Sequence, residues 1–168
     1  MRRASLFALL ILTAVLLQTT AFSRLTLFGV SPDLILVVVI SFALLDGPSV
    51  GAAAGFSGGL LRDLLLDSPK GLTGLSYLLV GYVVGSLRPY VQSTSLLVPV
   101  GGVFVGSLVG TALYQTLLVL LGRASLPATD AIRIVALTSV YNTLLVPFVY
   151  PLVRRISAMY RRESVLRW

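Results

Sequence analysis

Six apolar runs, separated by short breaks of proline, glycine and charged residues, dominate this sequence. They cover about residues 4–22, 32–46, 48–66, 72–87, 95–121 and 131–153. An α-helix rises about 1.5 Å per residue, so roughly 20 apolar residues reach across the hydrocarbon core of a bilayer. The pattern predicts an all-α polytopic membrane protein: a compact bundle of about six transmembrane helices over residues 1–153, followed by a basic tail over 154–168.

The composition supports a membrane protein and argues against an enzyme. Only 11% of the residues are charged, whereas soluble chains carry about 25%. The chain has no cysteine and no histidine, which excludes disulfides, thiol nucleophiles, thiolate zinc sites and imidazole catalysis. No phosphate-binding loop or catalytic serine set is visible either. We therefore predict a protein that is not an enzyme and has no cofactor or metal.

Three of the runs leave alternatives open. The first, bounded by Arg2-Arg3 and Arg24, is read as an uncleaved helix rather than a signal peptide because it exceeds the usual apolar region of such peptides. Asp46-Gly47-Pro48 separates the second and third runs, and the second is short for a full crossing. The sequence does not decide whether both span the membrane or form a re-entrant hairpin.

The basic residues predict an orientation. The net charge is +7, and positive residues concentrate on the cytoplasmic side of membrane proteins. Six crossings with both termini cytoplasmic, in the bacterial inner membrane, place most of the basic residues inside. The tail residues expected to dock on anionic lipid or on a cytoplasmic filament are Arg154, Arg155, Arg161 and Arg162. A basic patch beside an apolar body argues against nucleic acid as a partner.

Glycines recur at four-residue spacing in the third run, as Gly51, Gly55 and Gly59, and Asp63 continues the series. Residues four apart share a helix face, and small residues let membrane helices approach closely. Internal packing is the favoured reading of these glycines, and contact with a partner helix is the alternative.

Asp63 is the position that most suggests function, because an acid on a membrane-helix face is costly unless it is paired or hydrated. Arg133, near the start of the last run, is its possible counter-ion. The alternative is that Arg62-Asp63 only marks the end of the helix, where both side chains reach interfacial water.

Several segments resemble the rod shape-determining protein MreD family. The first is Pro32-Asp33-Leu34-Ile35-Leu36, followed by Gly47-Pro48, Val50-Gly51, Gly55-Phe56, Gly58-Gly59-Leu60 and Asp63. The second comprises Pro69, Gly71-Leu72, Leu75, Tyr77, Leu79-Val80-Gly81-Tyr82 and Gly85. The last comprises Tyr141-Asn142-Thr143-Leu144-Leu145, Pro147 and Tyr150-Pro151-Leu152.

This resemblance implies a role without chemistry of its own, in the machinery that directs lateral cell-wall synthesis. The implied partners are MreC, the actin-like MreB, the glycosyltransferase RodA and its partner transpeptidase. The implied fold is similar to the substrate-binding S-components of energy-coupling-factor transporters. The family offers no catalytic residues, so the matched positions are candidates only for the fold or for partner contact: Pro32, Asp33, Gly51, Gly55, Asp63, Gly81 and Tyr82.

Two functions follow. The first is a membrane scaffold that binds MreC through glycine-rich helix faces. The second is a small-molecule-binding S-component of a vitamin transporter, which requires convergent polar side chains in the outer half of the bundle, and the sequence offers few. Polar groups within the runs either line such a cavity or bond across helices: Gln18, Thr19, Thr20, Gln115, Thr116, Asn142 and Thr143.

Overall fold

A computed structural model of the chain describes residues 2–20, 28–66, 69–90, 97–123 and 127–165, without the side chains of 2–6 and 160–165. The described part contains six α-helices: α1 (Arg2–Thr20), α2 (Leu34–Asp46), α3 (Pro48–Leu65), α4 (Leu72–Ser86), α5 (Leu97–Leu120) and α6 (Ala128–Val165). A short 3₁₀ turn, η1 (Arg88–Tyr90), follows α4. The all-helical prediction is confirmed.

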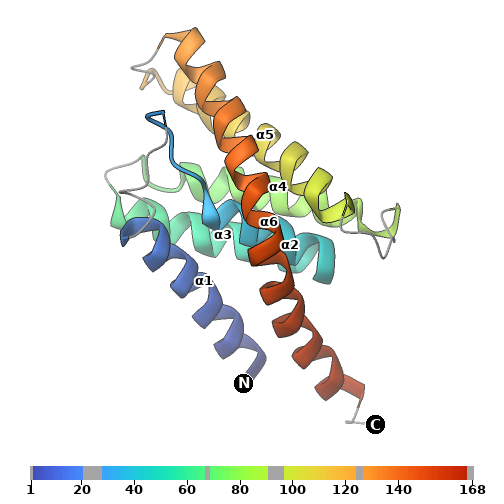
Figure 1. The fold of residues 1–168 in the computed structure, drawn as a ribbon. Helices are drawn as coiled ribbons and strands as arrows, with labels where there is room; N and C mark the ends of the chain where they lie inside the picture. The colour runs from blue at the N-terminus through green and yellow to red at the C-terminus, as the bar shows by residue number, and fades with distance from the viewer. Residues whose placement is uncertain (1, 21–27, 67–68, 91–96, 124–126, 166–168) are drawn as a thin grey trace.

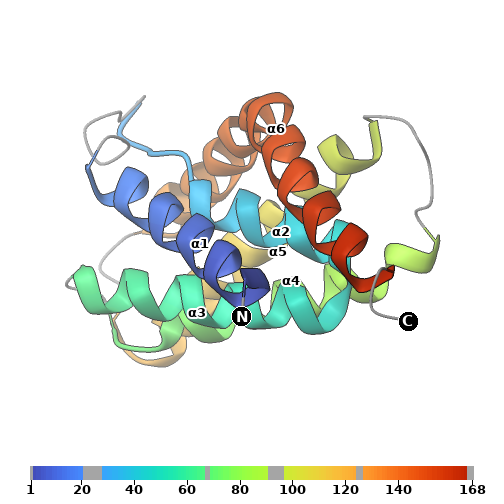
Figure 2. The same cartoon turned by 90° about the horizontal axis from the view of Figure 1, so that it is seen from below.

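The helix α2 lies in the centre of the bundle. It contacts each of the other five helices, and its residues from Leu34 to Ala43 are all buried. Figure 2 shows α2 between α1, α6 and the α3–α4 pair. The sequence LILVVVISFALLD, apolar except for Ser41 and Asp46, suits this position, because every face of the helix meets another helix.

The two termini lie at one end of the bundle, at the bottom of Figure 1. The opposite end, here called the distal end, contains the ends of α1, α3 and α5 and the starts of α2, α4 and α6. Gly47 makes the tight turn from α2 to α3 with φ +97°, a conformation that favours glycine. Pro48 then occupies the first turn of α3, where its missing N–H is not needed.

The glycine series of α3 packs directly against α4. A Cβ atom on Gly51 would lie 2.5 Å from the carbonyl oxygen of Gly81, and one on Gly59 would lie 2.6 Å from Cα of Gly74. The two backbones therefore touch along the length of both helices. In α5, Gly102, Gly106 and Gly110 instead meet side chains, from α2 at all three positions and also from α4 at the last two.

The outer surface of the bundle is apolar. Large side chains are exposed on α5 and α6, including Leu97 (78%), Leu120 (75%) and Phe148 (77%). Two helical segments, Leu97–Leu120 and Ala128–Met159, are long and apolar enough to cross a membrane. Lipid is the environment that suits such a surface.

The last helix differs from its predicted range. The sequence placed its end at residue 153 and a separate tail after it, whereas α6 continues to Val165 through Pro147 and Pro151. Val153 and Ser157 remain buried, and the Ser157 hydroxyl donates to Asp46 Oδ1 at 2.7 Å. Packing against the end of α2 therefore extends the helix beyond its prolines.

Candidate functional site

A cavity of about 260 Å³ lies at the distal end, above the start of α2. The helix α2 has only 13 residues, a length of about 20 Å, whereas α5 and α6 are far longer. The short central helix leaves space between its longer neighbours. Five helices and the segment before α2 supply the walls: Gln18, Gly29, Val30, Ser31, Pro32, Asp33, Arg62, Tyr77, Thr111, Tyr114, Gln115, Ile134 and Thr138.

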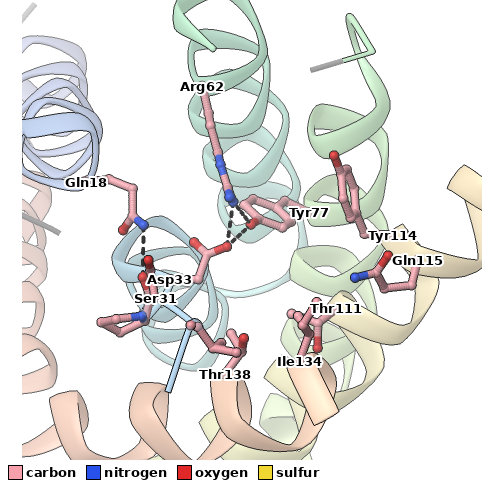
Figure 3. Close-up of a pocket in the computed structure, with 13 residues that line it drawn as sticks. Gln18, Ser31, Asp33, Arg62, Tyr77, Thr111, Tyr114, Gln115, Ile134 and Thr138 are labelled. Atoms are coloured by element: carbon pink, nitrogen blue, oxygen red, sulfur yellow. Dashed lines mark hydrogen bonds and ion pairs between the residues drawn. The ribbon is translucent and has the colours of Figure 1, made fainter. Parts of the chain in front are cut away.

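An ion pair joins two walls of this cavity. Arg62 Nη1 lies 2.6 Å from Asp33 Oδ2, with the arginine side chain 27% exposed and the aspartate 7%. The Tyr77 hydroxyl accepts from the same Nη1 and donates to the same carboxylate oxygen, so the three side chains form a closed triangle (Figure 3). A charged pair in so apolar a setting requires this complete set of partners.

Asp33 also caps α2. Its Oδ1 accepts from the backbone N–H of Leu36 at 3.1 Å, which satisfies one of the free N–H groups at the start of the helix. The carboxylate thus receives three donors, from Leu36, Arg62 and Tyr77.

Two amide side chains hold the start of α2 in place. Gln18 of α1 donates to the carbonyl of Pro32 and accepts from the N–H of Leu34, each at 2.8 Å. Asn142 of α6 accepts from the N–H of Asp33 at 2.6 Å and donates to the Ser107 hydroxyl of α5 at 2.9 Å. These bonds fix the segment around Pro32 and Asp33 from both sides.

Asp63 is fully buried, but it is not among the residues that line the cavity. Its Oδ2 accepts from the N–H of Thr73 at 2.9 Å and from that of Gly74 at 3.4 Å, at the start of α4. Arg133 is exposed and donates to the carbonyl of Phe28 at 3.1 Å. The pairing of Asp63 with Arg133 stays a prediction, and the ion pair that the described residues show joins Asp33 to Arg62.

The other candidate positions divide into buried and exposed groups. Gly51, Gly55, Gly59 and Gly81 are used in the contact between α3 and α4, so that face is not available to a partner helix. Tyr82 is 55% exposed on the opposite side of α4. Arg154 and Arg155 are exposed on α6. Arg161 and Arg162 continue the same helix, and their side chains lie outside the described set.

Arg62 and Tyr77 were not recognised as a functional pair from the sequence. Arg62 looked like a helix-end residue, and Tyr77 was only one position of a family pattern. Their partner, Asp33, is 29 and 44 residues away respectively. The sequence left open whether the polar groups within the apolar runs line a cavity or bond across helices. In the structure, Gln18 and Gln115 line the same cavity.

The arrangement offers hydrogen-bonding groups and one neutralised ion pair. Within the described residues, no group of three or more acidic side chains is placed to hold a metal ion.

The family comparison agrees with this picture. A family model described as rod shape-determining protein MreD matches residues 1–156. The chain belongs to the MreD family. No curated protein and no solved structure matches it. MreD proteins are shape-determining membrane proteins, so this chain has a role in determining rod shape. The matched range includes α1 to α5, α6 as far as residue 156, and every residue that lines the cavity.

Proposed function

We propose that this MreD-family chain is a non-catalytic membrane scaffold of cell elongation that binds MreC and associated proteins of lateral peptidoglycan synthesis. The family match over residues 1–156 is the observation that carries the proposal. MreC is the direct partner, and RodA with its transpeptidase and MreB form the wider complex. The protein crosses the inner membrane several times with both termini cytoplasmic.

The partner surface lies on the outside of the bundle. The glycine face of α3 is covered by α4, which removes the surface that the glycine spacing suggested. The outward side of α4 carries Leu75, Leu79, Tyr82 and Val83, each at least 40% exposed. Apolar helices in a bilayer associate through close side-chain contacts, and this strip offers them without disturbing the α3–α4 contact.

The basic end of α6 supports a second contact, with anionic lipid. Arg154 and Arg155 are exposed where α6 leaves the bundle, and Arg161 and Arg162 follow on the same helix. Each basic residue near an anionic membrane surface contributes about 1 kcal/mol of attraction.

The test is affinity purification from the native membrane in mild detergent, combined with photo-crosslinking from single positions. A photoreactive residue at Tyr82 is expected to crosslink to MreC, and a matched residue at exposed Phe148 of α6 serves as the control. Co-purification of MreC and the wall-synthesis enzymes supports the scaffold. Their absence from the purified material, with the bundle intact, contradicts it.

The cavity favours a second candidate, the S-component of an energy-coupling-factor vitamin transporter. Polar side chains from five helices converge at the distal end, which is the feature such a protein needs. The same affinity purification distinguishes the two functions, because an S-component is expected to co-purify with transporter ATPases instead of MreC. A fold similar to S-components is part of this alternative proposal.

A further inference from the structure

We infer that the distal cavity is a binding site for a phosphate group, either free or as the headgroup of a phospholipid. This site is separate from the exposed surface that would contact a partner, so it goes beyond the scaffold role and does not depend on it. The inference rests on which hydrogen-bonding groups of the cavity are already used and which are not.

The carboxylate of Asp33 is already largely occupied, since three of its roughly four acceptor positions are used. It receives the N–H of Leu36, Arg62 Nη1 and the Tyr77 hydroxyl. The positive charge of Arg62 balances it at 2.6 Å. A cationic ligand would need a free carboxylate, and Asp33 is the only acidic residue among those that line the described cavity. The cavity therefore does not suit a cation.

Arg62, in contrast, has donors to spare. A guanidinium carries five N–H donors, and in the described structure the hydrogen bonds of Arg62 all come from Nη1. The N–H groups of Nε and Nη2 point in parallel along the opposite edge of the same plane. Such an edge binds two oxygens of a phosphate or carboxylate at once.

Two further side chains in the cavity are also uncommitted. Thr138 is only 4% exposed, and its hydroxyl makes no hydrogen bond to the residues that the structure describes. The amide of Gln115 lines the same cavity and is likewise unbonded within the described ranges. Figure 3 shows Gln115 across the cavity from Arg62, with Thr138 on a third side. A buried polar group without a partner costs free energy unless water or a ligand satisfies it.

These groups together favour a tetrahedral oxyanion over a planar one. The guanidinium edge takes two oxygens, and Thr138 and Gln115 offer donors from α6 and α5 to the remaining ones. A volume of about 260 Å³ is close to the lower limit of about 300 Å³ for small-molecule pockets. It admits a phosphate group with a small polar substituent, while an attached lipid chain would have to remain outside.

The test is a thermal-stability titration of the purified full-length protein in a neutral maltoside detergent. The first probe is inorganic phosphate, and the second is dioleoylphosphatidylglycerol added to the micelles, with dioleoylphosphatidylcholine as its comparison. A ligand that binds the folded state raises the midpoint of unfolding according to its concentration and affinity.

Three variants make the test specific. Arg62→Lys keeps a positive charge beside Asp33 but lacks the parallel N–H edge. Thr138→Val removes the hydroxyl at nearly constant volume, and it decides the question if Arg62→Lys does not fold. Arg123→Gln is the matched control, because it removes an exposed charge at the same end of the bundle and outside the cavity.

Phosphate is expected to stabilise the wild type and Arg123→Gln, and to bind Arg62→Lys about tenfold or more weakly because charge-assisted hydrogen bonds are lost. Stabilisation by inorganic phosphate indicates that the free ion suffices. Stabilisation by phosphatidylglycerol alone, with the same dependence on Arg62 and Thr138, identifies the ligand as a headgroup. Absence of stabilisation by either probe, or equal stabilisation of all four proteins, overturns the inference.

Discussion

At the scale of single residues, Asp33 has three structural roles. Its carboxylate caps α2, pairs with Arg62 of α3 and accepts from Tyr77 of α4. Its backbone N–H is bound by Asn142 of α6. One short side chain and its own amide therefore connect four helices, which explains why so polar a residue is buried in an apolar bundle.

The Tyr77 hydroxyl is the part of this cluster that can be removed most cleanly. Tyr77→Phe keeps the ring and the ion pair, and removes one bond to each of Asp33 and Arg62. Because the lost bonds involve charged groups, we expect a decrease of about 1–3 kcal/mol in the free energy of unfolding. Reversible unfolding in detergent, followed by circular dichroism, measures it.

Tyr82→Phe is the control for this change, since Tyr82 lies five positions further along α4 and is 55% exposed. Its effect is expected to remain within about 0.5 kcal/mol. If both variants unfold alike, the hydroxyl of Tyr77 does not stabilise the cluster.

Sequence reasoning reached part of this cluster. Asp33 and Pro32 were selected through the family resemblance, and Asp63 through its place on the glycine face. Whether Asp63 was buried or reached interfacial water was left open, and in the structure it is 0% exposed. The partners were not predictable. Asp33 meets Arg62 because the segment before α2 descends into the bundle. Hydrophobic periodicity predicts helices, but it does not predict the course of an irregular segment. Asp63 accepts from backbone N–H groups at the start of α4, and such a role has no distinctive spacing in the sequence.

At the scale of helices, the contact between α3 and α4 depends on the absence of side chains. Gly85 and Pro48 meet at one end, where a Cβ atom on the glycine would lie 2.5 Å from the proline Cα. Gly59 and Gly74 meet at the other. The four-residue spacing predicted one close-packed face on α3, and the structure identifies α4 as its neighbour.

Gly55 tests this contact. A Cβ atom there would overlap the backbone of Tyr77, which cannot move aside as a flexible side chain could. We expect Gly55→Ala to lower the free energy of unfolding by about 1–3 kcal/mol, the usual cost of overpacking. Thermal unfolding in detergent measures the effect.

Gly101→Ala is the matched control, because nothing lies within 4 Å of the added methyl group. Alanine also favours a helix over glycine by about 1 kcal/mol, so this variant is expected to be neutral or more stable. Equal behaviour of the two alanine variants would show that α3 and α4 are not in backbone contact.

The helix whose range differs from the predicted one is α6, which extends to Val165. The sequence predicted a kink at Pro147 and Pro151, because proline removes a backbone bond and clashes with the preceding turn, and a basic tail after residue 153. In a bundle of apolar helices, neighbouring groups compensate for such a loss. The buried positions Val153 and Ser157 show that tertiary contacts continue beyond the prolines.

At the scale of the whole molecule, a polar cluster lies within a body whose outside is apolar. The charged pair and its amide neighbours gather at the distal end, whereas α5 and α6 present leucine, valine and phenylalanine outward. The number and order of the helices follow from the apolar runs. Their arrangement around α2 does not, since each run is apolar on all sides and no run indicates its neighbours.

The predicted orientation can be tested by thiol labelling, because the natural chain has no cysteine. We expect Arg123→Cys, in the distal turn after α5, to react with a membrane-impermeant maleimide in intact spheroplasts. Tyr90→Cys, 86% exposed at the opposite end, is expected to react only after the membrane is opened. The expectation follows from the larger number of basic residues at the end that carries the termini.

Both variants should retain the fold because each position lies on the surface. Labelling of Tyr90→Cys in intact spheroplasts, without labelling of Arg123→Cys, would reverse the orientation. It would also place the cavity on the cytoplasmic side.

The bond between the Asp33 amide and Asn142 joins residues 109 positions apart in the chain. During translation, α2 therefore enters the membrane well before Asn142, which satisfies the N–H of its N-cap residue Asp33, has been made. Until then a polar amide remains unsatisfied in an apolar setting, at a cost of about 1–3 kcal/mol. A nascent chain that stops before α6 is consequently not a shorter working protein but an unfinished one, and we expect proteolytic quality control in the membrane to remove it.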